Sequence, residues 1–448
     1  MTIAGDGTSW EKAFQTMEGA IDNPLLRSGD AIWVKSGRYA PTYEGWNSGP
    51  GTYDQGAGLT IKKTIRVFGG FPAGMEAPQW INRDWKSNET IIDADTQYWY
   101  ERQRCFYIRG DSNSFSVMGD VVIDGFVITN GRQSGGSGVF IENSNVTISN
   151  CIITGNYGRP GAYEYGGGIK VSGPTSAATI FNCVISGNWA QYGAAIAFVG
   201  VAASAEHHPR VINCTITGNR TTGVDGYVFP VAPTIFQYWA YEARLDIVNT
   251  ILWNNATDPS GTEIGFVDTT VYGIYENNPD QLTVSYSDIH GGSGQLWFDA
   301  LTDIDSDPRL VQLGHWEDNG TPEDTRDDYW IRGDERLQAG SPCIDAGDDG
   351  SVLMDVLDWD DDGDTNESAP FDLAYGPRFL GLVNIGAYEL TAAPEIDLDG
   401  DGDLDADDLA ILALDFGASE CGAETCAGDL DQDSDLDGSD LAAFAGAF

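Results

Sequence analysis

The sequence has few positive charges. Its 448 residues contain 23 Lys and Arg against 69 Asp and Glu, and the formal net charge is −46. Such a chain repels phosphate backbones and anionic lipid surfaces, which argues against nucleic acid and membrane surfaces as partners. The same charge favours the binding of cations.

Long hydrophobic runs are also missing. No stretch of 18 apolar residues occurs, so the sequence predicts no transmembrane helix and no membrane insertion. Met1 leads directly into the polar segment Gly5–Trp10 without an export signal. We therefore expect that this sequence is an interior part of a longer precursor whose export signal has been removed. We also expect the protein to be secreted or located at the cell surface.

Cysteine is sparse, and only Cys421 and Cys426 stand close together in the sequence. A small disulfide between them would suit an extracytoplasmic protein, and free thiols are the alternative.

The chain does contain a repeat in which two Asn residues stand six positions apart. Each copy alternates β-branched and polar residues and turns at an Asn or Gly-Asn, and Asp124 and Asn130 keep the spacing one copy earlier. A unit of this kind cannot bury its inner face alone, so we expect stacked coils. The four full copies are Val146–Asn156, Ala178–Asn188, Arg210–Asn219 and Leu245–Asn255.

Stacking gives the repeated polar residues a structural explanation. The first Asn of each copy should occupy one left-handed turn, and the Cys that follows it should stack in the core as a small hydrophobe. No His or acid repeats beside the cysteines, which argues against metal ligation there. The residues concerned are Asn150, Asn182, Asn213 and Asn249, and Cys151, Cys183 and Cys214.

The predicted fold class is all-β: a parallel β-helix solenoid with an N-terminal capping helix, followed by a small α-helical module of the EF-hand type. The spacing of Trp10, Phe14, Met17 and Ile21 after Thr8 predicts the helix over residues 9–21.

We expect the solenoid to span residues 1–391, with regular coils over about 119–290 and acidic C-terminal coils and loops over 302–390. Two departures, Tyr227–Tyr241 and Ala256–Gln281, should emerge as loops. A linker follows at 392–396, and the module occupies 397–448.

Two acidic segments of that module match the spacing of calcium-binding loops. Residues 397–408 place Asp at loop positions 1, 3, 5, 7, 9 and 12 with Gly402 at the tight turn, and residues 429–440 repeat the pattern with Ser434 at the turn. Apolar helical residues follow each loop. A disordered acidic tail is the alternative. The predicted Ca²⁺ ligands are Asp397, Asp399, Asp401, Asp403, Asp405, Asp408, Asp429, Asp431, Asp433, Asp435, Asp437 and Asp440.

A third acidic segment lies inside the body. Asp358, Asp360 and Asp362 stand at positions 1, 3 and 5 with Gly363 at position 6, but Ala369 at position 12 offers no closing carboxylate. Both a calcium site and a solvated acidic loop fit this pattern.

The paired loop–helix repeats of residues 397–448 resemble a type I dockerin module. That resemblance implies two bound Ca²⁺ ions and a helical face for a cohesin partner. Self-association through the same module is the alternative.

The body resembles the pectate-lyase-like class, and more closely the large secreted bacterial β-helix proteins of the choice-of-anchor kind. This resemblance implies a right-handed parallel β-helix and a secreted or surface-anchored location. It is carried by Asp6–Trp10, Gly29–Val34, Phe68–Phe71, Ser341–Gly347 and Asn384–Glu389.

A polysaccharide lyase, as this class suggests, needs a base for the proton beside a uronate carboxylate and cations for the charge that develops. Lys170 or His208 would be the base, while Arg159 and Arg220 would hold the carboxylate. For Lys170, a solvated strand residue is the alternative.

Two further hypotheses concern glycans. A glycosidase needs two facing carboxylates, for which the loops offer Glu164, Glu206, Asp225 and Glu242. A glycan binder would stack sugar rings on exposed aromatic residues, although the same residues could form a satellite hydrophobic cluster. The residues considered for stacking are Tyr163, Tyr165, Trp189, Tyr192, Tyr238 and Trp239.

Taken together, the sequence predicts a secreted or cell-surface calcium-binding β-helix protein. We expect its body to engage extracellular polysaccharide and its tail to serve attachment or assembly. A polysaccharide lyase or glycoside hydrolase acting in a β-helix groove, and a non-catalytic structural or filament-forming matrix protein, are the alternatives.

Overall fold

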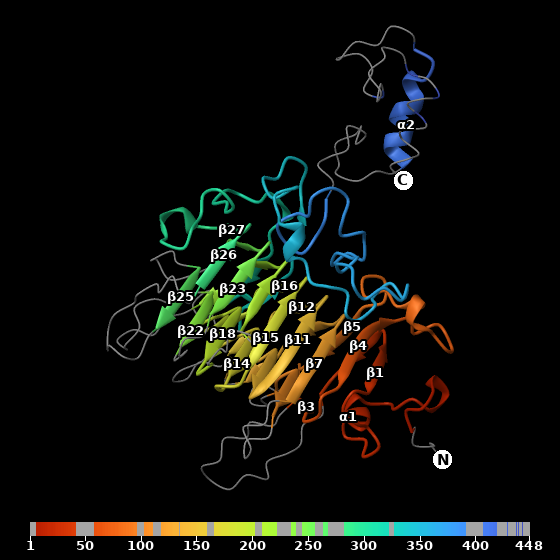
Figure 1. Ribbon diagram of the computed structural model, residues 1–448, viewed down its shortest axis with the longest axis vertical. Helices are drawn as coiled ribbons and strands as arrows, with labels where there is room; N and C mark the ends of the chain where they lie inside the picture. Colours follow the sequence, from red (N-terminus) through yellow and green to blue (C-terminus); the bar gives the residue numbers. More distant parts are fainter. Residues whose placement is uncertain are drawn as a thin grey trace.

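The computed structural model shows a stack of parallel β-coils (Figure 1). It describes residues 6–41, 58–95, 103–110, 118–133, 135–158, 165–201, 208–221, 234–238, 244–255, 263–267, 282–321, 327–390 and 406–418, together with residues 428, 436, 438 and 441. No helix among these residues is long and apolar enough to cross a membrane.

Three long parallel sheets form the walls of the stack. Sheet A contains β1 (Ala31–Lys35), β4 (Arg66–Phe71), β7 (Met118–Asp124), β11 (Ser144–Ser149), β15 (Ala177–Phe181), β19 (Arg210–Ile212), β23 (Leu245–Val248) and β26 (Leu282–Ser285). Sheet B contains β2 (Gly37–Tyr39), β5 (Thr90–Asp93), β8 (Val127–Thr129), β12 (Ile152–Thr154), β16 (Val184–Ser186), β20 (Thr215–Thr217), β24 (Ile251–Trp253) and β27 (Asp288–Ile289).

Sheet C contains β3 (Leu59–Ile61), β6 (Phe106–Arg109), β10 (Val139–Glu142), β14 (Ile169–Ser172), β18 (Ile196–Val199), β22 (Ile235–Tyr238) and β25 (Ile264–Val267). A fourth, short sheet contains β9 (Arg132–Gln133), β13 (Tyr157–Gly158), β17 (Trp189–Ala190) and β21 (Arg220–Thr221). The chain visits sheets C, A and B and then the short sheet in each regular coil, so every strand pairs with the strand one coil away.

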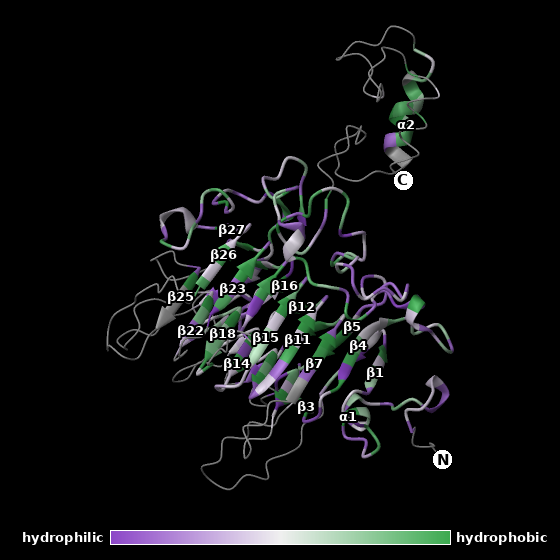
Figure 2. Ribbon diagram, in the orientation of Figure 1, coloured by the Kyte–Doolittle hydropathy of each residue, from purple (hydrophilic) through white to green (hydrophobic). Residues whose placement is uncertain are grey.

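Alternation along each strand builds the core. In β11, Val146 and Ile148 are buried and point inward, and their partners in β15 are Ala178 and Ile180. Apolar residues accordingly follow the stacked strands in Figure 2. The solenoid predicted from the repeat is therefore confirmed.

The repeated Asn residues form two ladders. Asn150, Asn182, Asn213 and Asn249 all adopt the predicted left-handed conformation, with φ between 49° and 53°. The second Asn of each copy is also paired: side-chain amides link Asn156 to Asn188 at 3.0 Å, Asn188 to Asn219 at 3.0 Å, and Asn219 to Asn255 at 2.9 Å.

The predicted cysteine stack is present. Cys151, Cys183 and Cys214 are fully buried, and burial together with the two neighbouring thiols raises the pKa of Cys183. These cysteines are free thiols in the core.

The predicted N-terminal helix is wrong in length. Residues 9–21 contain a 3₁₀ turn, η1 (Trp10–Lys12), and a separate five-residue helix, α1 (Met17–Ile21). The Thr8 hydroxyl and amide both bond Asp6, so Thr8 does not cap a helix. Instead the Thr16 hydroxyl accepts the Gly19 amide at 3.1 Å and starts α1, whose Met17 and Ile21 join the core.

The two predicted loops each contain a strand. Within Tyr227–Tyr241, β22 continues sheet C, and within Ala256–Gln281, β25 extends it by one more strand. These strands have four residues each, too few for the alternation to stand out from the polar sequence around them.

The acidic segment 302–390 does not continue the stack of coils as predicted. Its described strands form antiparallel pairs, β28 (Leu310–Gln312) with β31 (Asp334–Leu337) and β29 (His315–Glu317) with β30 (Tyr329–Ile331). Trp330 of β30 lies against Gly187 and Gly218, where an added Cβ would approach its ring to about 2 Å. The 3₁₀ turns η2 (Trp80–Asn82), η3 (Gly292–Gly294) and η4 (Asp349–Ser351) complete the described elements of the body.

The rest of this segment folds back over the outer face of the body. Outward residues such as Phe181 and Ile212 look like core residues in the sequence, and they are covered by Val352, Trp359 and Leu373. The first Asn ladder also bonds the segment: Asn182 accepts from Arg378, and Asn249 exchanges two hydrogen bonds with the Asp348 backbone. The segment folds back over this face because it buries a row of apolar side chains that would otherwise be exposed to water.

The first Asn ladder offers a matched pair of variants. We expect Asn182→Gly to lower the free energy of unfolding by about 2–4 kcal/mol, because Asn182 bonds Asn150 at 2.6 Å and accepts from the buried Arg378. Asn213 has the same left-handed backbone, but its side-chain amide has no partner among the described residues. Asn213→Gly should therefore change stability by less than about 1 kcal/mol in denaturant unfolding. Equal losses in the two variants would contradict the ladder argument.

The buried Glu263 should make the stability of the fold depend on pH. It is 3% exposed beside the last Asn of the second ladder, and burial raises its pKa from 4.5 to about 7. An ionised Glu263 opposes folding, so stability should fall as pH rises from about 4.5 through 7. Glu263→Gln should leave stability unchanged at pH 4 and raise it at pH 8 by on the order of 3 kcal/mol. The exposed Glu76→Gln is the control and should show no such pH dependence.

Candidate metal centre

Residues 355–367 form a closed acidic loop on the body. Seven of these thirteen residues are Asp or Glu and none is Lys or Arg. The loop ends meet through a bridge between Met354 and Ser368 and a 2.8 Å bond from the Asp355 amide to the Glu367 carbonyl. The backbone therefore holds carboxylates from both ends of the loop close together.

Local turns curl the middle of the loop. Asp358, Asp361 and Gly363 have positive φ values of 56°, 61° and 86°. The Gly363 amide donates to the Asp358 carboxylate at 3.0 Å, which ties position 6 of the loop to position 1. A tight turn with a positive φ at position 6 favours Gly there, as in calcium loops.

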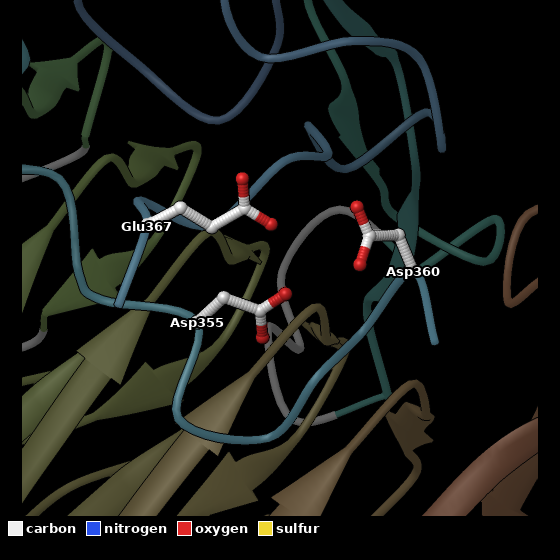
Figure 3. Close-up of side chains that lie close together, drawn as sticks. All are labelled: Asp355, Asp360 and Glu367. Atoms are coloured by element: carbon white, nitrogen blue, oxygen red, sulfur yellow. The ribbon is translucent and has the colours of Figure 1, made fainter. Parts of the chain in front are cut away.

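The carboxylates converge in two overlapping groups. Oxygens of Asp358, Asp360 and Asp362 lie within 4.8 Å of one another, and so do oxygens of Asp355, Asp360 and Glu367. Figure 3 shows the second group, with the three carboxyl groups directed toward one space. Asp360 belongs to both groups.

Asp355 and Glu367 are the ligand candidates that sequence spacing misses. Position 12 is Ala369, which is buried and offers no oxygen, whereas Glu367 stands at position 10 and Asp355 precedes position 1. The Glu367 Oε1 atom is buried and has no hydrogen-bond partner, so its acceptor capacity is unused. Only the chain closure at Met354 and Ser368 brings these two acids together.

The loop is anchored to the body by two indoles. Trp359 stacks on Phe181 with a ring distance of 5.9 Å, and its Nε1 donates to Asp124 at 3.1 Å. Trp80 Nε1 donates to the Asp358 carbonyl at 2.8 Å. The Trp359 amide in turn donates to both carboxylate oxygens of Asp355 at 2.9 Å.

The electrostatics of the loop are unfavourable without a cation. Burial, then repulsion by Asp360, Asp358 and Glu367, raises the pKa of Asp355 to about 6. Burial and the neighbouring carboxylates likewise raise the pKa of Glu367. A hard divalent cation bound by these oxygens would remove the repulsion, and oxygen-only ligand sets suit Ca²⁺.

Little of the predicted C-terminal calcium module is described. The helix expected after the first loop is present as α2 (Ala406–Asp415), in which Asp408 and Leu412 are buried. Leu436 lies against Gly428 and exchanges backbone bonds with Gly417 and Ala418. The other predicted Asp ligands of this module, and Cys421 and Cys426, lie outside the described residues.

The described residues considered for catalysis belong to three different sheets or their edges. Lys170 lies on β14 of sheet C, 4.9 Å from the Phe140 ring centre, whereas His208 precedes β19 of sheet A. Arg220, in the short sheet, donates to Asp328 at 2.5 Å. Arg159 and the four acids of the glycosidase hypothesis lie outside the described residues. The lyase assignment stays a prediction.

The aromatic candidates are mostly packed together. Tyr165 and Tyr192 are buried and stack on each other with a ring distance of 5.6 Å, and Trp189 is buried against Tyr157 at 4.4 Å. Tyr238 is half-buried in the same cluster as Tyr165. This is the geometry of a satellite hydrophobic cluster, and sugar stacking on it stays a prediction. Tyr163 and Trp239 lie outside the described residues.

The coils and the loop define the class of this protein: a parallel β-helix with a closed acidic loop on its outer face. The family described as "Right handed beta helix region" matches residues 85–298. With the sheet topology, this match makes the body a right-handed parallel β-helix, as predicted from the sequence.

Among solved structures, the chain is similar to one described as "Crystal structure of pectate lyase Pel9A". The two are 14% identical with a TM-score of 0.33, and the match covers 87% of this chain and 94% of that chain. A comparison with curated proteins found no match.

Because the carboxylates of the loop are crowded, one substitution should have opposite effects on stability with and without calcium. In chelator, Asp360→Asn should raise the free energy of unfolding by on the order of 1 kcal/mol, because it removes a negative charge from both groups. In millimolar calcium the same variant should be less stable than the parent, because it loses a ligand. Thermal unfolding in both buffers measures this, with the exposed Glu76→Gln as control. If Asp360→Asn is more stable than the parent in both buffers, or less stable in both, the result would argue against metal binding.

Proposed function

We propose that this chain is a calcium-binding right-handed β-helix protein of the cell exterior. The observation that carries the proposal is the pair of carboxylate groups sharing Asp360 in a loop that has seven acids and no base. Each of the two groups brings three carboxylates together, which is a strong repulsion for a loop held in one conformation.

Calcium is favoured by the donor set. All side-chain donors are carboxylate oxygens, and the unused, buried Glu367 Oε1 provides an additional acceptor. Ca²⁺ accepts six to eight oxygens in flexible geometry, whereas softer metals favour nitrogen or sulfur. The two acidic segments at 397–408 and 429–440 add two further predicted sites.

The C-terminal module and the body have separate roles in this proposed function. The C-terminal module serves attachment, either to a cohesin-like protein or to a second copy, in line with its dockerin-like spacing. The body engages extracellular polysaccharide, in line with the rigid solenoid, whose outer faces offer long rows of side chains in fixed register.

Counting bound calcium tests the proposal. Equilibrium dialysis of the full chain against ⁴⁵Ca²⁺ should give three ions per molecule. The combined variant Asp358→Asn, Asp360→Asn and Asp362→Asn should bind one fewer, because it removes all three side chains of one group. A matched variant with Asp397→Asn, Asp399→Asn and Asp401→Asn should also bind one fewer.

Circular dichroism in the presence of calcium would confirm that both variants keep their fold. If the variant in the body retains the calcium count of the parent, residues 355–367 are a solvated acidic loop and the proposed site is rejected.

A further inference from the structure

The described part of the returning C-terminal segment covers one end of the outer face of sheet A. Outward residues near the strand ends, such as Phe181 and Ile212, lie beneath that segment. Two positions earlier on the same strands, Thr179 and Arg210 are half-exposed. The row that contains Thr179 and Arg210 forms the floor of an open groove of about 350 Å³.

The parallel register aligns the groove residues. Thr147 of β11 pairs with Thr179 of β15, Thr179 with Arg210 of β19, and Arg210 with Asp246 of β23. Adjacent strands stand about 4.8 Å apart, so the row extends over about 14 Å. The groove therefore suits an extended ligand with several polar groups.

Among the residues that the structure describes, Arg210 has no carboxylate partner. The nearest acid in the row, Asp246, is occupied: its Oδ2 lies 2.6 Å from His208 Nε2, and its Oδ1 accepts from Arg244 Nε at 2.6 Å. No ion pair or side-chain hydrogen bond joins Arg210 to another described residue.

Three other shielded arginines are paired with acids of the chain. Arg83 pairs with Asp124, Arg220 with Asp328 and Arg378 with Glu389. A half-buried guanidinium that has no acid partner among the described residues is able to receive an anionic group of a ligand.

Further unused polar groups line the groove beside Arg210. The Asn145 Oδ1 atom is buried and has no hydrogen-bond partner among the described residues. Thr147 stands two positions after Asn145 on β11, and Thr179 lies between Thr147 and Arg210 in the row. Donors and acceptors in this order match a chain of sugar hydroxyls that carries an anionic group.

We infer that this groove binds an extracellular polysaccharide through a sugar unit that bears an oxyanion, a carboxylate or a sulfate ester. Arg210 holds the oxyanion in a two-point contact, and Asn145, Thr147 and Thr179 contact the neighbouring hydroxyls. This inference rests on the proposed function, because it assigns the polysaccharide of that proposal to a site.

Calorimetric titration of the full chain in calcium tests the inference. The probes are a uronate oligosaccharide, a sulfated oligosaccharide and a neutral oligosaccharide of the same length. Arg210→Gln should weaken binding of an anionic probe about 10- to 100-fold, because charged hydrogen bonds are lost. Arg210→Lys, which keeps the charge without the planar fork, should give an intermediate loss. The exposed Arg66→Gln, on β4 of the same sheet, is the matched control and should change binding less than about 2-fold.

The two anionic probes distinguish a carboxylate from a sulfate as the recognised group. Anionic binding that is unchanged in Arg210→Gln, in protein whose melting temperature matches the parent, overturns the inference. So does a parent that binds only the neutral probe, although the proposed function then stands. Failure of the parent to cosediment with any extracellular polysaccharide overturns both.

Discussion

In-register stacking is the constraint on which the body depends. Coils about 4.8 Å apart place equivalent side chains in contact, so each buried polar group must be satisfied by its own copy in the next coil. Asn meets this demand because its amide both donates and accepts, and Asn156, Asn188, Asn219 and Asn255 continue the bond from coil to coil. A change in one rung is therefore felt in the two coils that flank it.

The same rule explains where the C-terminal segment attaches. The first Asn ladder starts with an acid, Asp124, whose carboxylate bonds Ser149, Asn150 and Trp359 and pairs with the buried Arg83. Further along, the ladder is interrupted by groups from the returning segment at Asn182 and Asn249. Polar groups that the stack leaves unsatisfied thus become the attachment points of residues 348–378.

Sequence periodicity could predict the coils because a repeat is a local signal copied several times. The Asn turns and the cysteine stack follow from one unit and its period. β22 and β25 could not be predicted in this way, since each is four residues long within a polar segment. The fold-back of residues 302–390 could not be predicted either. Strand alternation places the apolar Phe181 and Ile212 on the outer face, but only the structure shows which distant residues cover them.

For the candidate metal centre, spacing alone identifies Asp358, Asp360 and Asp362. Asp355 and Glu367 escape because they meet through chain closure, a contact that no loop template encodes. Arg210 is a similar case. Its significance comes from having no acid partner among the described residues, which the sequence cannot show: the structure is needed to see that Asp246 bonds His208 and Arg244 instead.

The acidic loop is held in place by groups that do not depend on its charge. The Met354–Ser368 bridge, the stacking of Trp359 on Phe181 and the two indole bonds use no side-chain carboxylate of the loop. A cation that enters this loop therefore has little backbone to order, which favours tight binding. Because the same loop bonds Asp124 at the start of the Asn ladder, we expect a cation bound there to affect the stability of the first regular coils as well as the loop itself. The acidic loop and the hydrogen-bonded ladder of the stack are in this way parts of one connected network, through Trp359, Asp124 and Asn150.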